Sequence, residues 1–130
     1  MKIAIIGSDS FLAGYIITEL TNTSADIHLF GISEEKYPGF SFVHFNLPDL
    51  PLDISILADT DAIIYCAGAG IQANLNEDRN LIYELNAFQP IKLINQLAQN
   101  NYKGKFISFG SYFEIGNETE QKYYNELEVA

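Results

Sequence analysis

The sequence has few basic residues and a single cysteine, and both shortages exclude whole classes of protein. Its 130 residues carry 7 Lys and Arg against 17 Asp and Glu, a formal net charge of −10 at pH 7. Nucleic acids and anionic membrane surfaces are bound through clustered basic side chains, so neither is an expected partner. One cysteine excludes an internal disulfide and a multi-cysteine metal site.

Long apolar runs are also missing. No stretch is long enough to span a bilayer, and the N-terminus reads as a strand without the regions of a signal peptide. The length predicts one domain over residues 1–130, and 48% hydrophobic with 18% charged residues is typical of a globular protein. We therefore expect a cytoplasmic protein.

Apolar segments alternate with helical or connecting segments along the chain. The expected strands are KIAII (2–6), DIHLFGI (26–32), FSFVHF (40–45), DAIIYCAGAG (61–70) and GKFISFG (104–110). Helices are expected after Phe11, within 51–60, and from Glu77 to Gln99, the last one kinked at Pro90. The pattern predicts a Rossmann-like α/β fold, a doubly wound parallel sheet in the order 3-2-1-4-5.

Helical spacing places apolar side chains on one side of each expected helix. The positions expected to share a face are Leu12, Ile16 and Leu20 in the first helix, with Ala13 and Ile17 beside them, and Leu81, Ile82, Leu85, Ile94 and Leu97 in the long one. Residues 117–130 are polar and acidic, and no strand follows them. The pattern therefore indicates an unfinished fold.

The turn after the first strand has the start of a dinucleotide-binding motif. Such turns carry three glycines, for a tight turn, for backbone close to pyrophosphate and for close helix packing. Gly7 is the first, while Ser10 and Ala13 hold the second and third places. Both are small, and the serine hydroxyl can donate to phosphate. The alternative is a plain strand–turn–helix with Ser8 or Asp9 as the N-cap.

Four segments together resemble a known family. GSDSFLAGYIITEL resembles the G-x-x-G-[FY]-[IL]-G opening of the extended short-chain dehydrogenases, which are NAD-dependent nucleotide-sugar epimerases, dehydratases and reductases; Phe11 and Leu12 match its middle. DAIIYCAGAG is similar to the fourth-strand motif, and LIYELNAFQPIKLINQLAQ to the following helix, with Asn86 at its asparagine. FISFGSYFEIG resembles the strand-five motif, which places Ser111 at the catalytic serine.

The resemblance implies an NAD cofactor and a nucleotide-sugar partner. The cofactor-binding residues it implies are Gly7, Ser10, Phe11, Leu12, Asn46, Leu47, Ala67, Gly68 and Asn86. Asn46 and Leu47 stand at the family's adenine-holding pair, although an ordinary turn before Pro48 explains them equally well.

The residues after the second strand bear on the choice between NAD and NADP. Gly31 stands where an acid usually binds the ribose hydroxyls, Glu34 and Glu35 follow, and no arginine is present there. Carboxylates repel a 2′-phosphate, which favours NAD over NADP. A solvated acidic loop is the alternative.

Catalysis in this family uses a tyrosine and lysine in a Y-x-x-x-K helix, with the serine on the substrate oxygen. Tyr124 follows Ser111, but Glu128 stands where the lysine is expected. A carboxylate there raises the tyrosine pKa instead of lowering it. The resemblance also implies a substrate domain, and we expect the chain to be truncated before it. We therefore expect the isolated chain to be inactive, either because the true motif lies beyond residue 130 or because the base has been lost.

The second hypothesis is a stand-alone, non-catalytic module that binds a nucleotide or a protein. No residue pattern indicates a metal site. Cys66, His28 and His44 lie in expected strands and are interpreted as structural.

Overall fold

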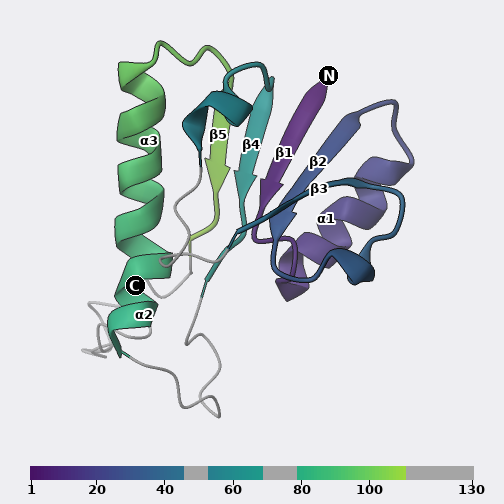
Figure 1. Cartoon of the computed structure of the whole chain (residues 1–130), viewed down its shortest axis with the longest axis horizontal. Helices are drawn as coiled ribbons and strands as arrows, with labels where there is room; N and C mark the ends of the chain where they lie inside the picture. Colours follow the sequence, from purple (N-terminus) through teal and green to yellow (C-terminus); the bar gives the residue numbers. More distant parts are fainter. Residues whose placement is uncertain (46–52, 69–78, 111–130) are drawn as a thin grey trace, which may run out of the picture.

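The protein is described here by a computed structural model covering residues 1–45, 53–68 and 79–110, in which a parallel sheet lies between helices (Figure 1). The strands are β1 (Lys2–Ile6), β2 (Asp26–Gly31), β3 (Ser41–His44), β4 (Ala62–Tyr65) and β5 (Lys105–Ser108). All neighbours pair in parallel, in the order β3-β2-β1-β4-β5. The predicted fold class and strand order are confirmed.

The first helix, α1 (Phe11–Thr21), and the short 3₁₀ segments η1 (Glu34–Lys36) and η2 (Ile54–Leu57) connect the strands. α1 connects β1 to β2 and covers one face of the sheet (Figure 1). η2 lies between β3 and β4, within the stretch where the sequence predicts a short helix.

The long helix predicted before β5 is interrupted. Its described part consists of α2 (Arg79–Tyr83), the π-helical segment η3 (Glu84–Phe88) and α3 (Gln89–Gln99). Pro90 is the second residue of α3 and has no N–H to donate to the preceding turn. The disruption predicted at Pro90 is therefore present as a π-helical turn shortly before the proline.

Alternate residues of β1 face opposite sides of the sheet and join two separate cores. Ile3 and Ile5 pack with Ala13 and Ile17 of α1. Ala4 and Ile6 face the other core, whose buried members also include Phe30, Phe45, Leu57, Ile63, Tyr65, Leu93 and Leu97. The central strand is therefore buried on both faces, as parallel sheets require.

Two apolar residues of the expected helix faces are exposed. Leu12 is 41% exposed because α1 buries Ala13 and Ile17 against the sheet, and Leu12 lies away from that buried stripe. Ile94 is 43% exposed because α3 contributes only the narrow stripe of Leu93 and Leu97 to the core.

Candidate dinucleotide-binding site

Gly7 follows β1 in a conformation that other residues rarely adopt. Its φ is +86°, and a Cβ built on it would lie 2.6 Å from the Cα of Ala67, the second residue after β4. Its amide donates to the Phe30 carbonyl of β2 at 2.8 Å. The turn is therefore pressed between the ends of two neighbouring strands, and a glycine is required for both reasons.

The N-terminus of α1 is capped by Ser10, not by Ser8 or Asp9 as the sequence suggested. The Ser10 hydroxyl accepts from the Ala13 amide at 3.2 Å, and the Ser10 carbonyl accepts from the Gly14 amide at 3.3 Å. The cap falls here because the helix begins only at Phe11.

The first turn of α1 still offers donors to an anion. Within the described ranges, the amides of Phe11 and Leu12 have no hydrogen-bond acceptor. The Ser10 hydroxyl accepts in its cap bond, so its own proton remains available. Free amides at a helix N-terminus, together with the helix dipole, favour an anion such as a pyrophosphate.

Ala13 holds the place of the third glycine without loss of packing. It is completely buried between α1 and the sheet, in contact with the core that contains Ile5 and Leu29. A methyl group thus fits at this helix–strand contact. Of the two missing glycines, only the one replaced by Ser10 changes what the turn presents to a ligand.

Asp9 is a residue of this turn whose role the sequence did not reveal. Its carboxylate accepts from the amides of Ile32 at 2.6 Å and Ser33 at 3.1 Å, directly after β2. Beside it, the Ser8 hydroxyl is fully buried and has no partner among the described residues. The glycine at position 31 is the feature of the sequence that could have indicated this contact, because only a residue without a side chain leaves room there for Ser8 and Asp9.

The end of β4 forms the neighbouring wall. Ala67 is half-buried against the turn and Gly68 is exposed. Cys66 lies just past β4, and its burial raises the pKa of the thiol to about 11, in keeping with an unreactive cysteine.

The π-helical segment meets the same end of β4. The Tyr65 hydroxyl donates to the Leu85 carbonyl at 2.6 Å, and burial raises the pKa of Tyr65 above its usual value. Asn86 follows Leu85 in this segment and is half-buried.

Several predicted site residues lie outside the described ranges. These are Asn46, Leu47, Ser111 and Tyr124, together with Glu128. The residues that the structure does bring together at the carboxyl edge of the sheet are Gly7, Ser10, Phe11, Leu12, Ala67 and Gly68.

The histidines have structural partners. His28 Nε2 lies 2.9 Å from the Asp26 carboxylate, and His44 Nδ1 lies 3.2 Å from the Ile32 carbonyl. No cluster of three metal-ligating side chains occurs among residues 1–45, 53–68 and 79–110. In the same ranges, every helix is too short or too polar to traverse a bilayer.

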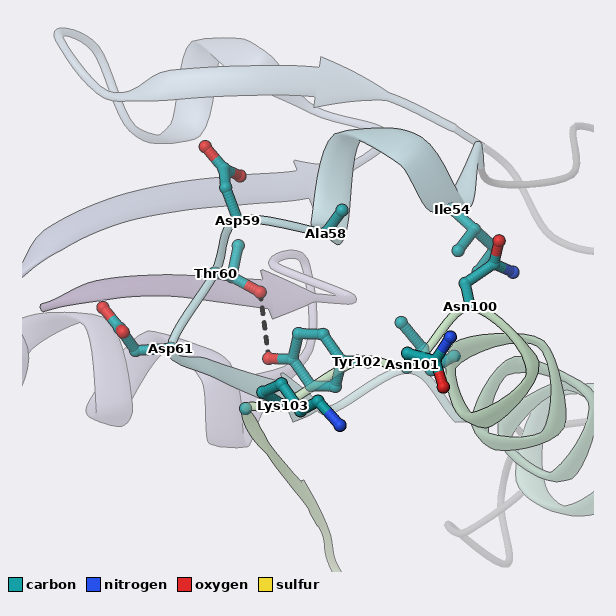
Figure 2. Close-up of a pocket in the computed structure, with 11 residues that line it drawn as sticks. Ile54, Ala58, Asp59, Thr60, Asp61, Asn100, Asn101, Tyr102 and Lys103 are labelled. Atoms are coloured by element: carbon teal, nitrogen blue, oxygen red, sulfur yellow. Dashed lines mark hydrogen bonds between the residues drawn. The ribbon is translucent and has the colours of Figure 1, made fainter.

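A cavity of about 340 Å³ lies at the opposite edge of the sheet (Figure 2). It is lined by residues that precede β4 and β5, including Thr60 and Gly104, and by Asn100 and Asn101 after α3. The hydroxyls of Thr60 and Tyr102 meet inside it at 3.0 Å. Ligands of open α/β sheets bind beyond the carboxyl ends of the strands, so this cavity at the amino ends is not the dinucleotide site.

The residues at the carboxyl edge fit a dinucleotide. Three features converge between β1 and β4, where the strand order reverses. They are the turn at Gly7, which leaves no room for a side chain, the free amides of α1, and the small residues after β4. This switch point is where such folds bind their cofactors.

Comparison with known proteins agrees with this assignment of the fold. No protein-family model and no curated protein sequence matches the chain. A solved structure from Bacillus halodurans, described as an NAD-dependent epimerase/dehydratase, matches with 22% identity and a TM-score of 0.73, over 98% of this chain and 58% of that one. The chain thus spans little more than half of this neighbour's length.

Two further neighbours were solved with NAD bound. The UDP-glucuronic acid 4-epimerase of Bacillus cereus has 17% identity and a TM-score of 0.70, over 97% of this chain and 44% of that one. The enzyme WbmH of Bordetella bronchiseptica has 18% identity and a TM-score of 0.68, over 88% of this chain and 40% of that one. The chain therefore shares the Rossmann-like fold of these neighbours.

Proposed function

We propose that the chain is the NAD-binding portion of an epimerase-, dehydratase- or reductase-like protein. The observation that carries the proposal is the position of the Phe11 and Leu12 amides, beside Gly7 at the switch point of the sheet. These groups would hold the pyrophosphate, and a bound nicotinamide would supply hydride transfer. A nucleotide sugar is the proposed substrate class of the complete protein.

Ser10 is the residue of this turn that we expect to determine the affinity for NAD. The Ser10 side chain narrows the approach to the backbone, and its cap bond engages the Ala13 amide. We therefore expect weaker NAD binding than a turn with three glycines would give.

The experiment is a calorimetric titration of the chain with NAD, NADH and NADPH. Ser10→Gly should bind NAD more tightly than wild type, because the Ala13 amide becomes a third donor, and should cost only a few tenths of a kcal/mol in stability. The matched control is Ala13→Gly, which changes a buried helix position. It should lose about 1 kcal/mol of stability without a gain in affinity.

The second candidate is a non-catalytic module that binds a protein. It is favoured by an exposed aromatic pair on α1, where Phe11 and Tyr15 are 79% and 62% exposed with ring centroids 5.0 Å apart. The absence of binding heat for wild type and Ser10→Gly at millimolar dinucleotide would favour this candidate over the first.

A further inference from the structure

The phosphate turn and the loop after β2 are tied together through Asp9. Its Oδ2 accepts from the Ile32 amide at 2.6 Å and its Oδ1 from the Ser33 amide at 3.1 Å. Its backbone carbonyl accepts from Lys36 Nζ at 3.0 Å. The carboxylate is thus fixed at the carboxyl end of β2 although it belongs to the turn after β1.

Gly31 makes this arrangement possible. A Cβ on Gly31 would lie 2.6 Å from Asp9 Oδ2 and would also collide with the Ser8 hydroxyl. In dinucleotide-binding folds, the end of β2 normally provides the acid that binds the ribose hydroxyls. Here β2 ends in a residue without a side chain, and a carboxylate from another element occupies that place.

The carboxylate retains capacity for a ligand. An ionised carboxylate offers about four acceptor positions, and the Ile32 and Ser33 amides use one on each oxygen. Asp9 is only half-buried, so its remaining lone pairs are open to hydroxyl donors.

We propose that Asp9 is the residue that binds the adenosine ribose and discriminates against NADP. This inference rests on the proposed function, and it replaces the expectation that Glu34 and Glu35 discriminate. Both glutamates lie exposed on η1, whereas Asp9 is fixed between the turn and β2. A 2′-phosphate at this ribose would meet the Asp9 charge directly.

Lys36 makes the charge effect measurable. Its ammonium contacts the turn through the Asp9 carbonyl, not through the carboxylate. When the Asp9 charge is removed, Lys36 remains as a cation at the same place, and it attracts a 2′-phosphate.

The test is a calorimetric titration of wild type and Asp9→Asn with NAD and with NADP. Loss of charge-assisted hydrogen bonds should weaken NAD binding about tenfold or more. NADP binding should be maintained or strengthened, so the NAD/NADP affinity ratio should fall at least about tenfold. In Asp9→Asn combined with Lys36→Met, the NADP affinity should decrease again.

The matched control is Glu34→Gln combined with Glu35→Gln, which removes two carboxylates from the same loop and should leave the ratio unchanged. If Asp9→Asn does not fold by circular dichroism, Asp9→Ser is tested by the same criterion. An unchanged ratio in the Asp9 variant, or a shifted one in the glutamate variant, overturns this inference while NAD binding by wild type upholds the proposed function. Failure of wild type to bind either dinucleotide overturns both.

Discussion

The Cα of Ala67 lies 2.6 Å from the position that a Cβ on Gly7 would occupy. The segments that follow the adjacent strands β1 and β4 therefore meet at the switch point without room for a single methyl group. Because the obstacle is backbone, no side-chain rotation can relieve it.

Gly7→Ala should lower both stability and cofactor binding. A left-handed φ and a backbone collision together cost at least about 2 kcal/mol. Urea unfolding measures the stability, and titration with NAD measures the binding.

The control for Gly7→Ala is Tyr102→Phe at the far edge of the sheet. The Thr60 hydroxyl donates to the Leu57 carbonyl at 2.7 Å, so the Tyr102 hydroxyl is the donor in their 3.0 Å contact. Its removal should cost about 0.5–1.5 kcal/mol and leave NAD affinity unchanged. Equal affinity of Gly7→Ala and wild type would contradict the proposed position of the site.

A double-mutant cycle should detect the contact between Ser8 and Gly31. Ser8→Ala removes a buried hydroxyl that has no partner among the described residues, so stability should stay level or rise by about 1 kcal/mol. Gly31→Ala should cost about 1–3 kcal/mol by overpacking.

In the double variant, part of the stability lost in Gly31→Ala should be recovered, because the Ser8 hydroxyl oxygen, one of the two atoms that collide with the new Cβ, has been removed. Unfolding by urea gives all four free energies. Strict additivity would show that the Ser8 hydroxyl does not restrict residue 31.

The Cys66 thiol should be unreactive near neutral pH. Burial raises its pKa to about 11, whereas a free thiol has a pKa of about 8.5. Labelling with an aromatic disulfide reagent at pH 8 should be much slower for the folded chain than for the chain in urea, where the same thiol serves as its own control.

The same shift predicts the direction of a pH effect on stability. A raised thiol pKa means that folding favours the protonated form, so this contribution is complete below about pH 8.5 and is lost as the pH rises toward 11. Replacing Cys66 by Ala should remove this part of the alkaline decline. An identical decline in Cys66→Ala would assign it to other groups.

The isolated chain should not turn over a nucleotide sugar. If Tyr124 stands for the catalytic tyrosine, as the resemblance implies, then Glu128 takes the place of the lysine that would lower its pKa, and loss of general-base assistance costs about 10²–10⁴ in rate. The assay uses UDP-, CDP- and dTDP-sugars with NAD(H) and NADP(H). Turnover that disappears in Tyr124→Phe would show that Glu128 does not prevent catalysis, and turnover that survives would exclude Tyr124 as the base.

The sequence by itself determined the architecture. Apolar runs separated by helical spacing leave parallel strands covered on both faces as the consistent arrangement, and β1 with its Ile3–Ile6 run is buried in that way. Gly7 and the small residue Ala13 likewise identified the turn, because both depend on local geometry that a motif records.

Tertiary structure alone decided what the turn presents to a ligand. The sequence could not show that Asp9 reaches the Ile32 and Ser33 amides, because that contact depends on the parallel pairing of β1 with β2 and on the space above Gly31. The sequence also named Ser8 or Asp9 as the cap instead of Ser10, because each of these side chains can accept from a helix amide and only the position of the first helical residue decides which one does. Spacing along a chain predicts elements, whereas the partner of a charged side chain is set by the approach of distant backbone.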